Sequence, residues 1–173
     1  MLTGRKVLLR AFRESDLGVL YRIFADLDTW AARSRRAPQP LTLEAFRDWY
    51  VPMAAGPDGA EFVIEAGAEP VGRCGLFGED RLVHVAEVGI ALLPEARGRG
   101  YGTDAMRLLV DFGFRARNLQ RVQLETLAGN SAALASYRKV GFVEEGVLRR
   151  HAWVDGAYVD TVVMGLLRDE WAG

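Results

Sequence analysis

The sequence predicts a single α+β domain, in which one mixed and mostly antiparallel sheet is flanked by helices. The length of 173 residues is typical of one domain, and the hydrophobic half of the chain is enough to form a core. Three strand-like runs joined by short turns predict an antiparallel meander. No repeat, low-complexity tract or linker divides the chain, so we expect one domain over residues 1–173.

The first third of the chain predicts a strand at residues 7–10, a helix at 17–24, a loop at 31–40 and a second helix at 43–49. Apolar residues three and four positions apart favour the first helix, which Ser15 or Asp16 would cap. Thr42 is expected to cap the second helix and Pro52 to stop it.

The meander strands are expected at residues 61–66, 70–77 and 84–93, and a helix over residues 104–117. Apolar residues of that helix form a stripe that we interpret as core packing. The remaining elements are a strand at 122–127, a helix at 131–140 that Gly141 stops, a strand beginning at 142–146, and a last strand at 158–167.

A glycine-rich run, Arg97-Gly98-Arg99-Gly100-Tyr101-Gly102, lies between the third meander strand and the following helix. A turn of this kind leaves backbone N–H groups unpaired, and the helix macrodipole adds about half a positive charge at the same place. Such a turn can bind phosphate oxygens without many cationic side chains. Its position favours a nucleotide cofactor over the alternative of a tight turn with no ligand.

Three phosphate-binding patterns compete for this run. A P-loop requires a lysine that Gly100-Tyr101-Gly102-Thr103 does not contain. A dinucleotide fingerprint requires a third glycine, which Thr103 replaces, and an earlier acidic residue than Glu125. The pattern R/Q-x-x-G-x-G/A is matched fully by Arg97, Gly100 and Gly102.

A second segment, Asn130 to Phe142, matches the pattern N-x-x-S/A-x-x-x-Y-x-K-x-G-F. With both patterns in the correct order, the chain resembles the GCN5-related N-acetyltransferases (the GNAT superfamily) over nearly its whole length. The segments Gly156–Asp160 and Leu166–Trp171 resemble the branch that contains ribosomal-protein N-terminal acetyltransferases and spermidine acetyltransferases.

The resemblance implies direct transfer of an acetyl group from acetyl-CoA to a primary amine, either a peptide or protein N-terminus or a small amine. The Leu92 N–H would bond the acetyl oxygen, and Tyr137 would protonate the leaving thiolate, unless this tyrosine only packs its helix against the sheet. The implied cofactor-binding residues are Ile90, Ala91, Leu92, Arg97, Gly98, Arg99, Gly100, Tyr101, Gly102, Thr103 and Asn130.

The general base is left open by the sequence. Glu87, at the start of the strand that would hold the cofactor, is the first candidate, and a solvent-facing carboxylate is the alternative. Glu125 is the second choice. A basic cluster, Arg33, Arg35 and Arg36, either attracts an acidic partner or is simply solvated. A non-catalytic acetyl-CoA-binding module is the competing function, and a nicotinamide oxidoreductase is a distant third.

The composition narrows the class of protein. A net charge of −1, from 22 basic and 23 acidic residues, argues against nucleic-acid binding. No apolar run approaches the roughly 20 residues needed to span a bilayer, and the N-terminus does not resemble a signal peptide. Cys74 alone cannot form an internal disulfide, and His84 and His151 have no metal-ligand spacing. We expect a cytoplasmic enzyme, monomeric or homodimeric, with no metal and no membrane partner.

Overall fold

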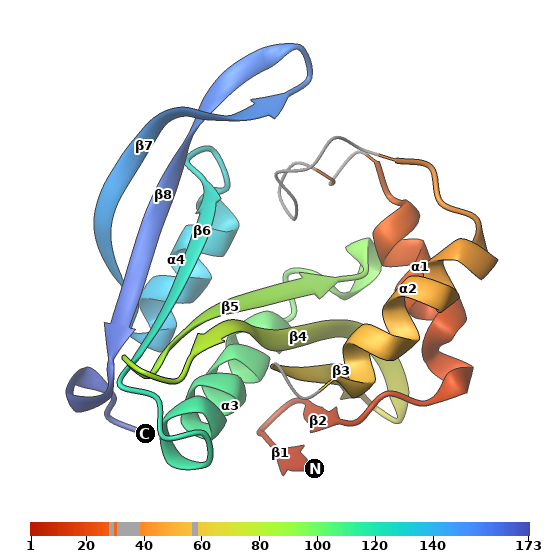
Figure 1. The fold of residues 1–173 in the computed structure, drawn as a ribbon, viewed down its shortest axis with the longest axis horizontal. Helices are drawn as coiled ribbons and strands as arrows, with labels where there is room; N and C mark the ends of the chain where they lie inside the picture. The colour runs from red at the N-terminus through yellow and green to blue at the C-terminus, as the bar shows by residue number, and fades with distance from the viewer. Residues whose placement is uncertain (28–29, 31–38, 57–58) are drawn as a thin grey trace.

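An eight-stranded sheet, with strands in the order β1-β2-β3-β4-β5-β6-β8-β7, forms the centre of the computed structural model, which describes residues 1–27, 30, 39–56 and 59–173 (Figure 1). The strands are β1 (Leu2–Thr3), β2 (Leu8–Arg10), β3 (Ala60–Ala66), β4 (Glu69–Asp80), β5 (Val85–Leu92), β6 (Arg121–Leu127), β7 (Val143–Val154) and β8 (Ala157–Leu167). The helices are α1 (Leu17–Ala25), α2 (Leu43–Ala55), α3 (Tyr101–Arg115) and α4 (Ser131–Val140), with 3-10 turns η1 (Glu14–Asp16), η3 (Pro94–Ala96) and η4 (Arg168–Glu170).

The pairing of the strands confirms the predicted mixed, mostly antiparallel sheet. β3, β4 and β5 form the predicted antiparallel meander. β5 and β6 pair in parallel, with α3 in the connection between them. β8 then pairs antiparallel with both β6 and β7, so the last two strands form a long hairpin at one side of the sheet (Figure 1).

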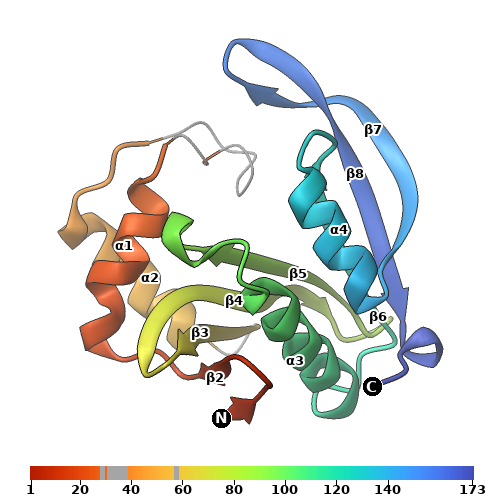
Figure 2. The ribbon, with the colours of Figure 1, turned by 180° about the vertical axis from the view of Figure 1, so that it is seen from behind.

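Two apolar clusters attach the helices to the sheet. The larger one joins α3 and α4 to one face through residues such as Met106, Leu109 and Leu134. The smaller one joins α1 and α2 to the other face through Leu20, Phe46 and neighbouring side chains. The helices therefore lie on opposite faces of the sheet (Figures 1 and 2).

Several element boundaries follow from the local chemistry that the sequence indicated. The Thr42 hydroxyl caps α2 by accepting from the Ala45 N–H at 3.1 Å, and Gly141 ends α4 with a φ of 118°. The carboxylate of Asp16 serves a different purpose from the expected cap, because it accepts hydrogen bonds from the guanidinium of Arg10 at 2.7 and 2.8 Å.

Other boundaries differ from the prediction. The prediction that Pro52 stops α2 was wrong, since the helix continues to Ala55. In the last turn of a helix, a proline removes one backbone hydrogen bond without interrupting a longer ladder. α3 begins at Tyr101 rather than at Asp104, so the end of the glycine run forms the first turn of this helix. The basic cluster Arg33, Arg35 and Arg36 lies outside the described residues.

Candidate active site

β5 and β6 are paired along only part of their length. Their parallel pairing begins at Val85 with Arg121 and ends at Glu87 with Gln123. Beyond that point β5 stays paired with β4 as far as Leu92, while β6 stays paired with β8 as far as Leu127. The two strands therefore separate in a V (Figure 1), which leaves the facing backbone edge of β5 without a strand partner.

The open edge of β5 presents the amides of Ile90 and Leu92. The Leu93 N–H donates to the Val71 carbonyl of β4 at 3.0 Å. Because backbone groups alternate along an antiparallel ladder, the N–H and C=O groups of Leu92 and Ile90 point away from β4, whereas those of Ala91 point toward it. Of the three residues predicted for backbone contact with the cofactor, Ile90 and Leu92 are thus oriented toward the V.

The glycine run forms the connection from η3 to α3. Gly98 and Gly100 have φ values of 74° and 80°, in the left-handed region, and Gly100 is the N-cap of α3. Within the described residues, the backbone N–H groups of Gly98 to Thr103 donate no hydrogen bond to another protein atom. These donors gather at the positive end of the α3 macrodipole, which is the arrangement that binds phosphate.

Two side chains fix the position of this loop. The guanidinium of Arg97 turns back to the Leu92 carbonyl, with its Nε at 3.2 Å, and so ties the loop to the end of β5. On the other side, the Lys6 Nζ donates to the Arg99 carbonyl at 2.8 Å. Asp104 accepts from the backbone N–H groups of Lys6 and Val7 at 2.6 and 3.1 Å. Lys6 could not be predicted from the sequence, because a contact that joins residues so far apart in the chain leaves no local signal.

α4 brings Asn130 and Tyr137 to the same side of the sheet as the glycine loop. Asn130 caps α4 by accepting from the Ala133 N–H at 3.2 Å. The hydroxyl groups of Thr103 and Ser136 are 2.8 Å apart and link the first turn of α3 to α4. Tyr137 packs edge-on against Phe142, and burial raises its pKa to about 12, so that the phenol keeps its proton at neutral pH.

Both candidate bases lie on the opposite face of the sheet from Tyr137. Glu87 is exposed and occupies the vertex of the V, where pairing with β6 ends. Glu125 alternates along β6 with the buried Leu124 and Thr126, which point to the α3 and α4 side. A group bound in the V would therefore have Tyr137 on one side and the two carboxylates on the other.

Cys74 is closer to the site than its position in the sequence suggests, since it pairs with Ile90 across β4 and β5. Its side chain is fully buried, and this burial raises the pKa of the thiol well above its ordinary value. A thiol in this state is a poor nucleophile. Cys74 is therefore part of the apolar core that joins α3 and α4 to the sheet.

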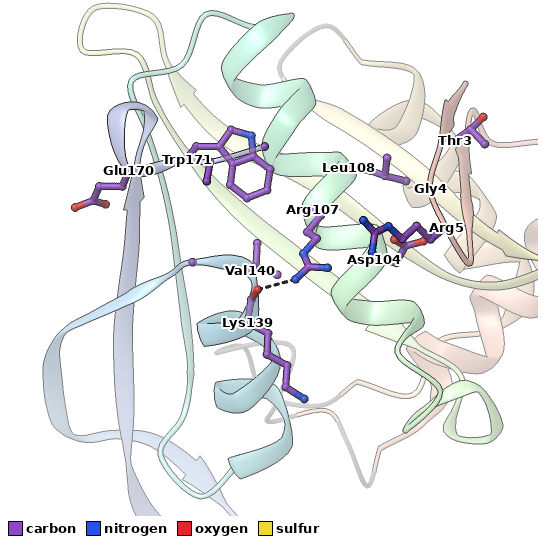
Figure 3. A pocket seen from close by; sticks show the side chains of 13 residues that line it. Thr3, Gly4, Arg5, Asp104, Arg107, Leu108, Lys139, Val140, Glu170 and Trp171 are labelled. Carbon is purple, nitrogen blue, oxygen red and sulfur yellow. Dashed lines mark hydrogen bonds between the residues drawn. The ribbon is translucent and has the colours of Figure 1, made fainter.

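A separate pocket of about 740 Å³ lies on the outer side of α3 and α4 (Figure 3). Arg5, Asp104, Arg107 and Lys139 line it, and Arg107 donates to the Lys139 carbonyl at 3.0 Å. None of the residues predicted for the cofactor or for catalysis lines this pocket. Among the described residues, no three side chains are grouped to hold a metal ion, and no helix is long and apolar enough to cross a membrane.

Comparisons with known proteins agree with this geometry. A family model described as an acetyltransferase (GNAT) domain matches residues 6–143. The putative ribosomal N-acetyltransferase YdaF of Bacillus subtilis is 30% identical over 141 residues, which cover 79% of this chain and 77% of that protein. The spermidine N(1)-acetyltransferase of Escherichia coli K12 is 32% identical over 64% of this chain, and the match spans 59% of the relative's length.

Two solved structures show the same arrangement. The spermidine N-acetyltransferase of Vibrio cholerae, in complex with CoA and spermine, superposes with a TM-score of 0.87 at 23% identity and covers 97% of this chain and 99% of its own. At this identity the likeness establishes the fold. Mycobacterium smegmatis RimJ, in complex with CoA-disulfide, superposes with a TM-score of 0.80 at 25% identity over 96% of this chain and 84% of its own.

Proposed function

Because this chain belongs to the GNAT acetyltransferase family, we propose that it transfers the acetyl group of acetyl-CoA to a primary amine, with both substrates bound together. The observation that carries this proposal is the V between β5 and β6, which has the unpaired amides of the glycine loop at its open end. A phosphate site and an open strand edge in continuity fit a ligand with a pyrophosphate at one end and an amide-bearing arm at the other.

The cofactor would lie along β5. Its pyrophosphate would bind the N–H groups of Gly98 to Thr103, and the cation of Lys6 lies beside the same loop. The pantetheine amides would pair along the open edge of β5 near Leu92 and Ile90 as an added strand does, except at the Leu92 carbonyl, which already accepts from the Arg97 guanidinium. The thioester would then reach the deeper part of the V, where an N–H of Ile90 or Leu92 polarises the acetyl carbonyl.

The acceptor would enter from the face that carries Glu87 and Glu125. The amine nitrogen, after losing one proton to a base, attacks the thioester carbon, and the C–N bond forms as the C–S bond breaks. The leaving thiolate takes a proton from Tyr137, and the phenolate regains one from the nitrogen of the product amide through water. The balance is one acetyl group moved, one free thiol formed and one proton released.

The acceptor class that we propose is a primary amine on a neutral or acidic molecule, such as a peptide N-terminus. The near-neutral net charge of −1 supports it, since a polyamine specialist would benefit from a more acidic surface. Polyamines are the second candidate, which the spermidine acetyltransferases among the relatives favour. The near-neutral charge also supports the absence of a nucleic-acid partner, and we propose in addition that the protein is cytoplasmic and is a monomer or a homodimer.

A thiol-release assay over a panel of amines tests the function. The panel should contain peptides with varied first residues, free amino acids, spermidine and spermine, with calorimetric titration of acetyl-CoA in parallel. Turnover on a peptide N-terminus above that on polyamines supports the proposal, and the reverse preference would select the polyamine alternative. Cofactor binding without turnover on any acceptor would favour a non-catalytic module, and no binding at all would exclude the function.

A further inference from the structure

A bulge in β7 brings His151 onto the face of the sheet that carries the candidate bases. β7 and β8 pair regularly at Leu148 with Thr161 and again at Ala152 with Val159, so three residues of β7 face one of β8 in between. Arg150, in the middle of the bulge, has a φ of 54°, which is unusual for a residue other than glycine. Bulges of this kind re-aim side chains and are enriched near active sites.

The Nδ1 atom of His151 faces two oxygen atoms. It lies 3.0 Å from the Thr161 hydroxyl oxygen and 3.4 Å from the Oε2 of Glu125. Thr161 is 5% exposed, and the side chains of His151 and Glu125 are 36% and 23% exposed. The three residues come from three neighbouring strands, β7, β8 and β6, so the packing of the sheet holds them together.

The trio lies level with the part of the V where the thioester is proposed to sit. Glu87 is paired with Gln123, so two residues further along each strand Glu125 is level with Gly89, next to Ile90. Thr161 pairs with Leu127, which shares a face of β6 with Glu125. His151 is therefore on the acceptor side of the sheet, at the depth where the reacting amine must lose its proton.

We infer that His151 is the proton acceptor for the amine and that Glu125 is its positioning residue. A carboxylate and a hydroxyl oxygen beside Nδ1 favour the tautomer that carries hydrogen on Nδ1, which leaves a lone pair on Nε2. No described residue forms a hydrogen bond with Nε2. The inference rests on the proposed acetyl transfer and assigns the base that the sequence left between Glu87 and Glu125.

The proton step is simple to balance. The acceptor arrives as an ammonium ion, gives one proton to Nε2 directly or through water, and becomes the neutral nucleophile. The imidazolium so formed is stabilised by the Glu125 carboxylate and releases its proton to solvent after the product leaves.

Other charged groups surround the bulge: the Asp160 carboxylate accepts from the Arg150 N–H at 2.8 Å, Arg149 and Arg150 are exposed, and Glu87 shares this face of the sheet.

The test is the pH profile of kcat/KM with two acceptors whose amines titrate differently, a peptide N-terminus at roughly pH 8 and an alkylamine at roughly pH 10. A limb of the profile, meaning the pH range over which kcat/KM changes, shifts between the two acceptors if it reports titration of the acceptor amine. A limb that belongs to an enzyme imidazole stays at the same pH with both acceptors. We expect the second limb in the unchanged enzyme and its loss in His151→Gln, with kcat lowered about 100-fold and an unchanged acetyl-CoA Kd by calorimetry.

His84 is the matched control, because it is the other histidine of the chain and its φ of 54° can be adopted by asparagine. His84→Asn should keep the limb and the rate. In His151→Ala, added imidazole should restore activity in proportion to its neutral fraction, which a merely structural histidine would not show. A His151→Gln enzyme that keeps the limb, or a His151→Ala enzyme that imidazole does not rescue, would overturn the inference. If the chain without substitutions showed no turnover on any acceptor, the proposed function itself would be refuted instead.

Discussion

The hydroxyl groups of Thr103 and Ser136 lie 2.8 Å apart and connect the helix that follows the glycine loop to the helix that carries Tyr137. The contact joins two segments that are 33 residues apart in the chain. Ser136 is the residue next to Tyr137, the proposed general acid, and Thr103 belongs to the proposed phosphate site. The contact therefore joins the two proposed parts of the site directly.

Ser136→Ala should lower stability by about 1 kcal/mol, the usual net value of one hydrogen bond. It should also lower kcat several-fold, because α4 loses its anchor beside Tyr137, while the acetyl-CoA Kd changes little. Chemical denaturation and steady-state kinetics measure these effects. Thr103→Val and the double variant complete a cycle, and additive losses would show that the two hydroxyl groups are not coupled.

Gly100→Glu should abolish acetyl-CoA binding, with a loss in affinity of at least about 100-fold, or roughly 3 kcal/mol. A side chain here begins 3.0 Å from the Lys6 Nζ and brings a negative charge to the proposed pyrophosphate site. Calorimetry measures the affinity. Gly156→Glu is the control, since Gly156 has a nearly identical φ of 81° in the β7–β8 turn with open space around it. Equal affinity in the two variants would remove the basis for placing phosphate at this loop.

Tyr137→Phe should lower kcat about 10- to 100-fold and leave the acetyl-CoA Kd unchanged, because an acid acts mainly in the transition state. The variant also changes the pH dependence of stability. Burial raises the pKa of Tyr137 to about 12, whereas an unfolded tyrosine titrates at roughly 10. The contribution of this pKa difference to the free energy of unfolding is complete below pH 10 and is lost as the pH rises to 12. The unchanged protein should therefore lose more stability than the Tyr137→Phe variant over this range.

Cys74→Ser should retain kcat within about threefold if the acetyl group passes directly between the two substrates. The buried thiol, with its raised pKa, is not available to form an acetyl-cysteine intermediate. Thermal unfolding should show a lower Tm, since a hydroxyl replaces a thiol in the core. A large fall in kcat in a variant that still folds and binds acetyl-CoA would instead indicate a covalent route.

Glu87→Gln should raise the KM for the acceptor several-fold and keep the imidazole limb of the pH profile. The reason is its position: Glu87 is exposed at the vertex of the V, where it can attract an ammonium group, whereas the limb is assigned to His151. Steady-state kinetics over the same pH range measures both quantities. If the limb disappears in Glu87→Gln but not in His151→Gln, Glu87 is the base.

The sequence predicted most elements because their signals are local. Thr42 and Gly141 acted as expected at helix ends, since a cap depends on the nearest residues alone. Pro52 did not stop α2, because three further residues stay helical after it although the proline itself donates no backbone hydrogen bond. The length of β7 was also not predicted, since its exposed side chains do not alternate between apolar and polar.

In the candidate site, too, the residues that the sequence could indicate are those with local signals. Arg97, Gly100, Gly102 and Asn130 form patterns of fixed spacing within one or two elements, so the sequence could indicate them. The orientation of Leu92 and Ile90 depends on the register with β4, and the position of His151 depends on a bulge between two strands. Pairings of this kind are set by tertiary packing, and no local pattern in the chain encodes them.

The bulge that positions His151 also changes what the edge of the sheet can do. A long, regular edge strand can add a strand from another molecule, which is the first step toward fibres. Here one edge is β1, with two residues, and the other is β7, whose register shifts near Glu145 and again between Leu148 and Ala152. The β7–β8 hairpin exposes Trp153 and Tyr158, yet it offers no long straight edge. A variant that deletes the bulge would be the form most prone to aggregate through strand addition.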